Sequence, residues 1–147
     1  MIVVSACLLG VNCKYNGKNN DNEKVKEFLK DKEFIIVCPE QLGGLTTPRQ
    51  PSEINYKDGK EVLKGNSKVL SCEEKDVTEN FLKGAEESLK IAKIYNCKKA
   101  LLKESSPSCG CNYIYDGSFT GNKISGMGVT AALFQENNIE VFSEKEL

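Results

Sequence analysis

The sequence contains no histidine and no tryptophan among its 147 residues. Without histidine, the chain cannot form Cys/His zinc fingers, Ser-His-Asp triads or the Cys-His pairs of thiol hydrolases. Any acid–base chemistry must therefore use carboxylates, lysine, tyrosine, thiols or metal-bound water.

An excess of charge and a long apolar run are missing as well. Lys and Arg number 20 against 21 Asp and Glu, which argues against nucleic-acid binding through bulk charge and leaves room only for a local basic patch. No apolar stretch approaches the roughly 18 residues of a membrane helix. The opening MIVVSAC lacks the basic n-region and the long apolar run of an export signal. We therefore expect a cytoplasmic protein that begins with a strand and does not bind a membrane.

Cysteine, by contrast, is abundant. The seven cysteines are Cys7, Cys13, Cys38, Cys72, Cys97, Cys109 and Cys111. In a reducing cytosol, clustered cysteines indicate metal binding or catalysis before they indicate disulfides. The length suits one domain with a real hydrophobic core, so we expect residues 1–147 to form a single domain.

Short apolar runs alternate with helical patterns along the chain. The expected strands span 2–6, 34–37, 100–102 and 139–142, and the strand at 34–37 is expected to be buried. The expected helices begin after Asn20–Asn22, at an Asp76/Glu79 capping box, and at Gly128. The pair Asp58-Gly59 predicts a small hairpin. This alternation predicts an α/β, Rossmann-like fold with helices on both faces of a mostly parallel sheet.

Three cysteines follow the expected strands. Cys7 follows the first strand, Cys38 ends the second, and Cys109 lies in the loop that leaves the third. The carboxyl ends of parallel strands share one edge of a sheet, so three loops would bring three thiols to one crevice. Cys97 would lie at the opposite edge as a buried small residue, the usual state of a free cysteine.

The remaining cysteines are less well placed by the sequence. A structural role is expected for Cys72, whereas Cys13 and Cys111 are spare ligands or a regulatory pair. There is no C-x-x-C and no ferredoxin run, so spacing alone favours a zinc or iron–sulfur site only weakly. Position alone leaves a metal or cluster site and scattered core thiols equally open.

Several sequence blocks occur together and in order. VSACLLGVNCKYNG, CPEQLGGLTTPRQPSEI, LLKESSPSCG, IYDGSFTG and GMGVTAALF run from the N-terminus to the last expected helix. In these blocks the chain closely resembles the DUF523 family, which includes thiouracil desulfidase, an enzyme that removes sulfur from 2-thiouracil without net redox change. Asn16 and Thr46 depart from the family pattern, where Asp and Pro are usual, and neither is a ligand position.

The resemblance implies a [4Fe-4S] cluster held by three cysteines, with one iron left open for the substrate sulfur. Those cysteines match Cys7, Cys38 and Cys109. The resemblance also implies a catalytic acid at Glu40 and a catalytic serine at Ser106, with Ser105 and Ser108 as neighbouring alternatives. It implies a small thiolated pyrimidine as substrate, without fixing which one.

Other residues in the same loops are candidates for substrate binding. Arg49 could hydrogen-bond a pyrimidine carbonyl or form a surface salt bridge, Tyr15 could stack on a planar base or serve as a packing anchor, and Ser108 or Tyr113 could also reach the ring. Glu40 has its own alternative as a solvated glutamate or the partner of Arg49, and Ser106 as a turn cap beside Pro107.

Two other functions stay open. A small iron–sulfur or zinc protein with a structural or electron-transfer role would need a fourth protein ligand, most simply Cys13 or Cys111. A binding module for thiolated nucleotides or tRNA would need a basic patch that this composition does not indicate.

Overall fold

A four-stranded parallel sheet forms the centre of the computed structural model, which describes residues 1–147. The strands are β1 (Ile2–Ser5), β2 (Phe34–Val37), β5 (Lys99–Leu102) and β8 (Glu140–Ser143), in the order β2-β1-β5-β8. β1 pairs in parallel with both β2 and β5, and β5 pairs in parallel with β8. The prediction of an α/β fold built on a parallel sheet is confirmed.

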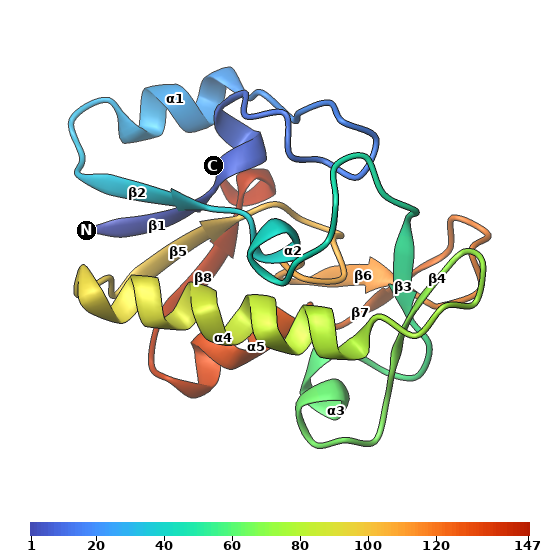
Figure 1. The fold of residues 1–147 in the computed structure, drawn as a ribbon. Coiled ribbons are helices and arrows are strands. Elements are labelled where there is room, and N and C mark those ends of the chain that lie inside the picture. The colour runs from blue at the N-terminus through green and yellow to red at the C-terminus, as the bar shows by residue number, and fades with distance from the viewer.

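Helices cover both faces of this sheet (Figure 1). α1 (Glu23–Leu29) lies on one face, where Val4 packs in a cluster with Val25 and Leu29. α4 (Thr78–Ile94) and α5 (Val129–Glu136) lie on the other, where Val3 belongs to the largest core cluster. Neighbouring residues of a strand point to opposite faces, so Val3 supplies one cluster and Ile2 and Val4 supply the other.

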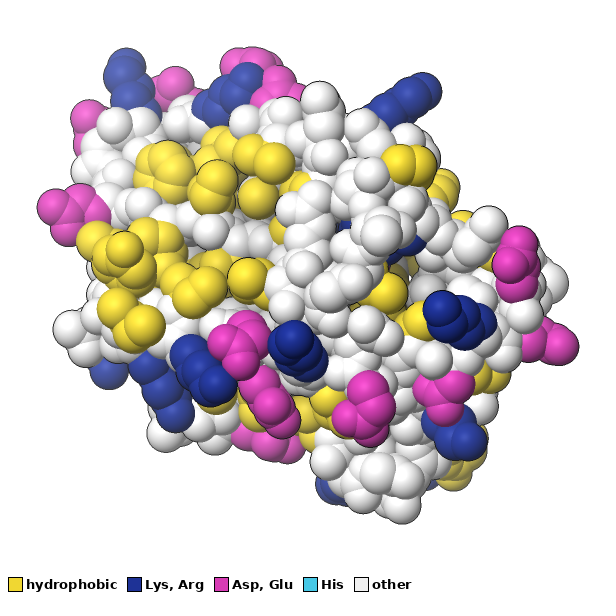
Figure 2. All heavy atoms as spheres, viewed as in Figure 1, with side chains coloured by type: hydrophobic (Ala, Val, Ile, Leu, Met, Phe, Trp, Pro, Cys, Tyr) yellow, Lys and Arg dark blue, Asp and Glu magenta, His cyan; other side chains and the backbone are white.

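The second strand is not buried as expected. β2 is an edge strand, and its side chains Phe34 and Ile36 are exposed. Hydrophobic side chains gather on the β2 side of the molecule in Figure 2. An apolar run of four residues does not distinguish an edge strand from a central one, because that difference depends on which strands pair with it.

Two antiparallel ribbons complete the fold. β3 (Ser52–Ile54) pairs with β4 (Val69–Ser71), and β6 (Tyr113–Tyr115) pairs with β7 (Lys123–Ser125). Figure 1 shows both ribbons beyond the carboxyl ends of the sheet strands. The short helices are α2 (Pro39–Leu42), α3 (Gly59–Leu63), and two 3₁₀ turns, η1 (Ala6–Leu9) and η2 (Glu144–Glu146). None of the helices is long and apolar enough to cross a membrane.

The hairpin expected at Asp58-Gly59 is absent. Asp58 instead caps α3, because its carboxylate accepts a hydrogen bond from the Lys60 amide at 3.1 Å. The other carboxylate oxygen accepts from the Met127 amide at 3.0 Å. Gly59 lies so close to the Gly128 carbonyl that any Cβ would overlap it. The Asp58-Gly59 pair begins a helix because it is held by contacts with Met127 and Gly128, which lie far away in the sequence and are not part of the local pattern.

The two expected helix caps have different outcomes. Asn22 caps α1 as predicted, accepting from the amides of Lys24 and Val25 at 2.9 and 3.2 Å. The capping box at Asp76 and Glu79 is wrong: α4 begins at Thr78, and Val77 occupies the N-cap position without a side-chain bond. Asp76 accepts from the Thr78 amide at 2.9 Å and forms a turn just before the helix.

Candidate active site

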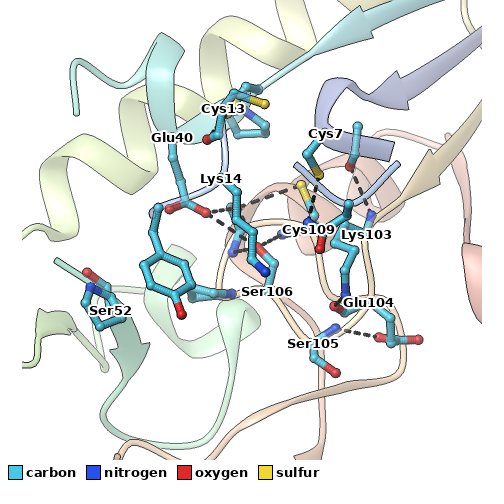
Figure 3. Close-up of a pocket in the computed structure, with 18 of the residues that line it drawn as sticks. Cys7, Cys13, Lys14, Glu40, Ser52, Lys103, Glu104, Ser105, Ser106 and Cys109 are labelled. Atoms are coloured by element: carbon cyan, nitrogen blue, oxygen red, sulfur yellow. Dashed lines mark hydrogen bonds between the residues drawn. The ribbon is translucent and has the colours of Figure 1, made fainter. Parts of the chain in front are cut away.

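Three cysteines from three neighbouring strands line one cavity of about 430 Å³. Figure 3 labels two of them, Cys7 and Cys109. Cys7 lies in η1 directly after β1, Cys38 is the N-cap of α2 after β2, and Cys109 lies in the loop after β5. The strands all run in parallel, so their carboxyl ends, and these thiols, meet at one edge. The structure thus brings together the three cysteines that strand position singled out.

Two glycines hold α2 in place beside the cavity. A Cβ on Gly84 of α4 would overlap the Pro39 carbonyl, and one on Gly43 would overlap the Asn80 carbonyl. Asn80 also donates a hydrogen bond from Nδ2 to the Gly43 carbonyl at 2.9 Å. This close approach of two helices fixes the position of Cys38 and the next residues, including Glu40.

Cys13 is a fourth thiol at the same cavity. It is buried, and its carbonyl accepts a hydrogen bond from the Cys38 thiol at 3.8 Å. The interaction among the thiols of Cys7, Cys13 and Cys38 raises the pKa of Cys13 and is the largest single influence that lowers the pKa of Cys7 and of Cys38. For Cys38 the pKa falls to about 7, with help from the Gln41 amide. Cys7 also accepts from Asn20 Nδ2 at 3.4 Å.

The other cysteines differ from this group. Burial raises the pKa of Cys109 to about 12. Cys97 is buried just before β5, away from the cavity, as predicted. Cys72 is exposed, with its thiol 3.0 Å from Gln50 Oε1, so it contributes nothing to the core. Cys111 is buried and donates to the Cys109 carbonyl at 3.5 Å, which leaves Cys13 as the spare thiol that faces the cavity.

Glu40 points from the first turn of α2 into a polar group on the cavity wall. Its Oε1 accepts from Arg49 Nε at 3.1 Å, and its Oε2 accepts from Ser108 Oγ at 2.8 Å and from Ser106 Oγ at 3.5 Å. The side chains of Glu40 and Arg49 are only 16% and 7% exposed. Glu40 is therefore both the partner of Arg49 and a cavity carboxylate, rather than a solvated loop residue.

Ser106 orders the loop that carries Cys109. Its Oγ accepts from the amides of Ser108 and Cys109, each at 3.1 Å, and lies 2.8 Å from Ser108 Oγ. The expected turn role is present, and it leaves the Ser106 proton free for Ser108 or Glu40. Ser108 is buried and stands between Ser106 and the carboxylate. Ser105 lines the cavity too, with its amide directed to Glu104 at 3.2 Å.

Arg49 uses most of its hydrogen-bond donors within the protein. Besides Glu40, its guanidinium donates to the Cys13 carbonyl at 2.7 Å, to the Thr46 carbonyl at 3.2 Å and to Thr47 Oγ1 at 3.0 Å. Its geometry suits a residue that positions Glu40 and the Cys13 loop. Tyr15 is 41% exposed and lines the cavity, so its ring is available to a ligand. Tyr113 is exposed and does not line the cavity.

The sequence did not point to two further carboxylates at the cavity, Glu104 and Glu53. Glu104 Oε1 accepts from four backbone amides, those of Ser105, Cys111, Asn112 and Tyr113, at 2.9 to 3.2 Å. Burial raises the pKa of Glu104, but the hydrogen bonds from Asn112, Tyr113 and Ser105 outweigh it and hold the pKa at about 2. Glu104 and Glu53 each lie inside one of the sequence blocks that resemble the DUF523 family, and this position is the only sequence signal that could have indicated them.

Comparisons with known proteins agree over the whole chain. The family model described as 2-thiouracil desulfurase matches residues 2–146. The uncharacterised protein YbbK of Bacillus subtilis (strain 168) is 46% identical over 147 residues, covering 100% of this chain and 97% of YbbK. A solved structure of the [4Fe-4S]-dependent thiouracil desulfidase TudS (DUF523Vcz) superposes with a TM-score of 0.86 at 38% identity. That alignment covers 99% of this chain and 91% of TudS.

Proposed function

Because this chain belongs to the 2-thiouracil desulfurase family, a family of enzymes, we propose that it removes sulfur from a thiolated pyrimidine such as 2-thiouracil. The products would be uracil and sulfide, without net redox change. The cofactor would be a [4Fe-4S] cluster bound by Cys7, Cys38 and Cys109. The observation that carries the proposal is the convergence of these thiols, from three adjacent strand ends, on a cavity that also contains Glu40.

The donor set supports an iron–sulfur cluster. The three cysteines are free thiols, and thiolates are the ligands that such clusters use. No three Cys, Asp or Glu side chains of this chain converge closely enough to hold a single metal ion. Thiolates that bind separate irons of one cluster surround a volume instead of a point, which agrees with thiols spread around a cavity. When bound, the cluster would supply an iron without a protein ligand, a Lewis acid suited to the soft thiocarbonyl sulfur.

Glu40 is the proposed general base. A water must attack the carbon that bears the sulfur, and a carboxylate is the natural proton acceptor in a chain without histidine. Arg49 holds one oxygen of Glu40 in place, while the other oxygen faces Ser106 and Ser108. Glu40 would take one proton from the attacking water as the new C–O bond forms. The C–S bond would then break as the hydroxyl group loses its second proton and becomes the carbonyl, and the sulfur would leave with the two protons of the water as hydrogen sulfide.

The two serines give the base a hydrogen-bonded path. Ser108 donates to Glu40 at 2.8 Å, and Ser106 lies 2.8 Å from Ser108, so a proton can pass along this line by small rotations of the hydroxyl groups. We propose that Ser106 orients the water or the ring, and that Ser108 and Tyr15 contact the substrate. Arg49 acts through Glu40 more than through the substrate, because four of its hydrogen bonds go to the protein.

The test is an assay of protein purified and reconstituted anaerobically. Loss of 2-thiouracil is followed by ultraviolet absorbance, and uracil and sulfide are quantified beside iron content. We expect one uracil and one sulfide for each 2-thiouracil consumed, and no turnover by cluster-free protein. Cluster-replete protein that leaves every thiopyrimidine intact would contradict the proposal and favour a structural or electron-transfer iron–sulfur protein.

A further inference from the structure

The cavity has a second wall that carries none of the proposed cluster ligands. It consists of residues from β3 and from the β6–β7 ribbon: Pro51, Ser52, Glu53, Tyr115, Phe119 and Gly121. Figure 3 shows Ser52 across the cavity from Cys7 and Cys109. A substrate whose sulfur faces the thiols would present the rest of its ring toward this wall.

Glu53 is the one charged side chain of this second wall. It is only 9% exposed, and its Oε1 accepts from the amides of Gly117 and Phe119 at 2.9 and 3.2 Å. These bonds fasten the β6–β7 loop to β3, so Glu53 also determines where Phe119 lies.

The other oxygen of Glu53 has no partner in the protein. No side chain or backbone group hydrogen-bonds to Oε2, and no Lys or Arg pairs with the carboxylate. The only fully enclosed side-chain oxygen or nitrogen without a partner is Thr130 Oγ1, so Glu53 Oε2 is not sealed in the core. The neighbouring Ile54 is buried in the core and points the opposite way along β3. Glu53 lines the cavity, so Oε2 is an acceptor without a protein partner on the cavity wall.

A carboxylate oxygen without a protein donor, on a residue only 9% exposed, is stabilised by a hydrogen bond from a ligand N–H. We propose that Glu53 Oε2 accepts the ring N–H beside the thiocarbonyl of the substrate, namely N3–H, which 2-thio- and 4-thiopyrimidines share. This inference rests on the proposed desulfuration and assigns Glu53 the recognition of the ring. Tyr15, Tyr115 and Phe119 line the same cavity and offer aromatic faces to a planar ring.

The contact also selects a chemical form of the substrate. A carboxylate accepts a hydrogen bond only from the tautomer that keeps the N–H and the C=S double bond. The thiol tautomer presents a lone pair at that nitrogen and would be repelled by Glu53. Glu53 would thus present the electrophilic thiocarbonyl form to the thiol side of the cavity, which makes it a specificity-determining residue.

Glu53→Gln separates this role from support of the loop. The amides of Gly117 and Phe119 both need an acceptor, so the Gln oxygen would keep the position of Oε1 and its NH₂ group would face the cavity. The loop would stay fastened while the cavity side changes from an acceptor to a donor. We expect the iron content of Glu53→Gln to be unchanged. Its KM for 2-thiouracil and its Kd for uracil, measured by equilibrium dialysis, should each rise about 10- to 100-fold. Exposed Glu73→Gln is the matched control and should match the parent.

Methylated substrates test the inference in the parent protein without any variant. Anaerobically reconstituted parent should bind 3-methyluracil at least about 10-fold more weakly than uracil, and Glu53→Gln should lose this discrimination. Equal binding of the two ligands by the parent, or unchanged KM and Kd in Glu53→Gln, would overturn the role of Glu53. If the parent discriminates between the ligands but turns over no thiopyrimidine, the proposed function fails and the recognition by Glu53 stands.

Discussion

Ser108 Oγ donates a hydrogen bond to Glu40 Oε2 at 2.8 Å, although 68 residues separate the two positions. Glu40 belongs to α2, after the second strand of the chain, and Ser108 to the loop after β5. The bond connects two loops that each carry a proposed cluster ligand, Cys38 and Cys109. The proposed base and the proposed cluster site therefore depend on the same loop–loop contact, and variants must distinguish loss of chemistry from loss of the cofactor.

Removal of any one proposed ligand should abolish the cluster. Cys7→Ala, Cys38→Ala and Cys109→Ala each leave one iron without its thiolate, and we expect the visible absorbance of anaerobically purified protein to disappear. Cys72→Ala and Cys97→Ala, outside the cavity, are the controls and should keep full iron content. Full cluster content in Cys7→Ala would contradict the three-cysteine site.

Cys13 decides between an open iron and a closed site. It is the one cysteine besides the three proposed ligands that lines the cavity, so it is the protein group best placed to act as a fourth ligand. We expect Cys13→Ala to retain its cluster, with iron content within about 20% of the parent, because three thiolates suffice in the proposed site. Loss of the cluster in Cys13→Ala alone would favour four-cysteine ligation and the structural or electron-transfer function.

Glu40→Gln should separate catalysis from cluster binding. Gln keeps the size of the side chain but cannot accept the proton of the attacking water, so we expect kcat to fall about 10²–10⁴-fold with iron content unchanged. Ser106→Ala and Ser108→Ala should lose less, since a serine that orients the reacting partners is not itself the base. Turnover by Glu40→Gln at the parent rate would place the base elsewhere and favour metal-bound hydroxide.

Glu104 should make the free energy of unfolding of the cluster-free protein fall at acidic pH. Its pKa is lowered from 4.5 to about 2 in the folded state, so the stability it contributes is present above about pH 4.5 and is lost as pH falls toward 2. A shift of this size corresponds to roughly 3 kcal/mol. Urea unfolding should show Glu104→Gln destabilised at pH 7 and closer to the parent at pH 3. A difference that stays constant with pH would contradict this account.

Much of the site follows from local pattern. The apolar runs at β1, β2 and β5 alternate with helices, and this pattern predicted a parallel sheet whose carboxyl ends would gather Cys7, Cys38 and Cys109 at one edge. The resemblance to the DUF523 family, found in the same blocks, is confirmed by the family match over residues 2–146. The roles assigned to Glu40, Ser106 and the three cysteines stay predictions until the variants are measured.

Tertiary structure decided what depends on distant partners. The Asp58-Gly59 pair begins a helix because Gly128 packs against it, and Phe34 and Ile36 of β2 are exposed at the edge of the sheet. Glu53 lines the cavity beside the β6–β7 loop, which lies more than 60 residues further along the chain and donates two amides to it. Periodicity and turn signals report on a residue and its near neighbours, whereas pairing partners, burial and hydrogen-bond donors come from segments that only the folded chain brings together.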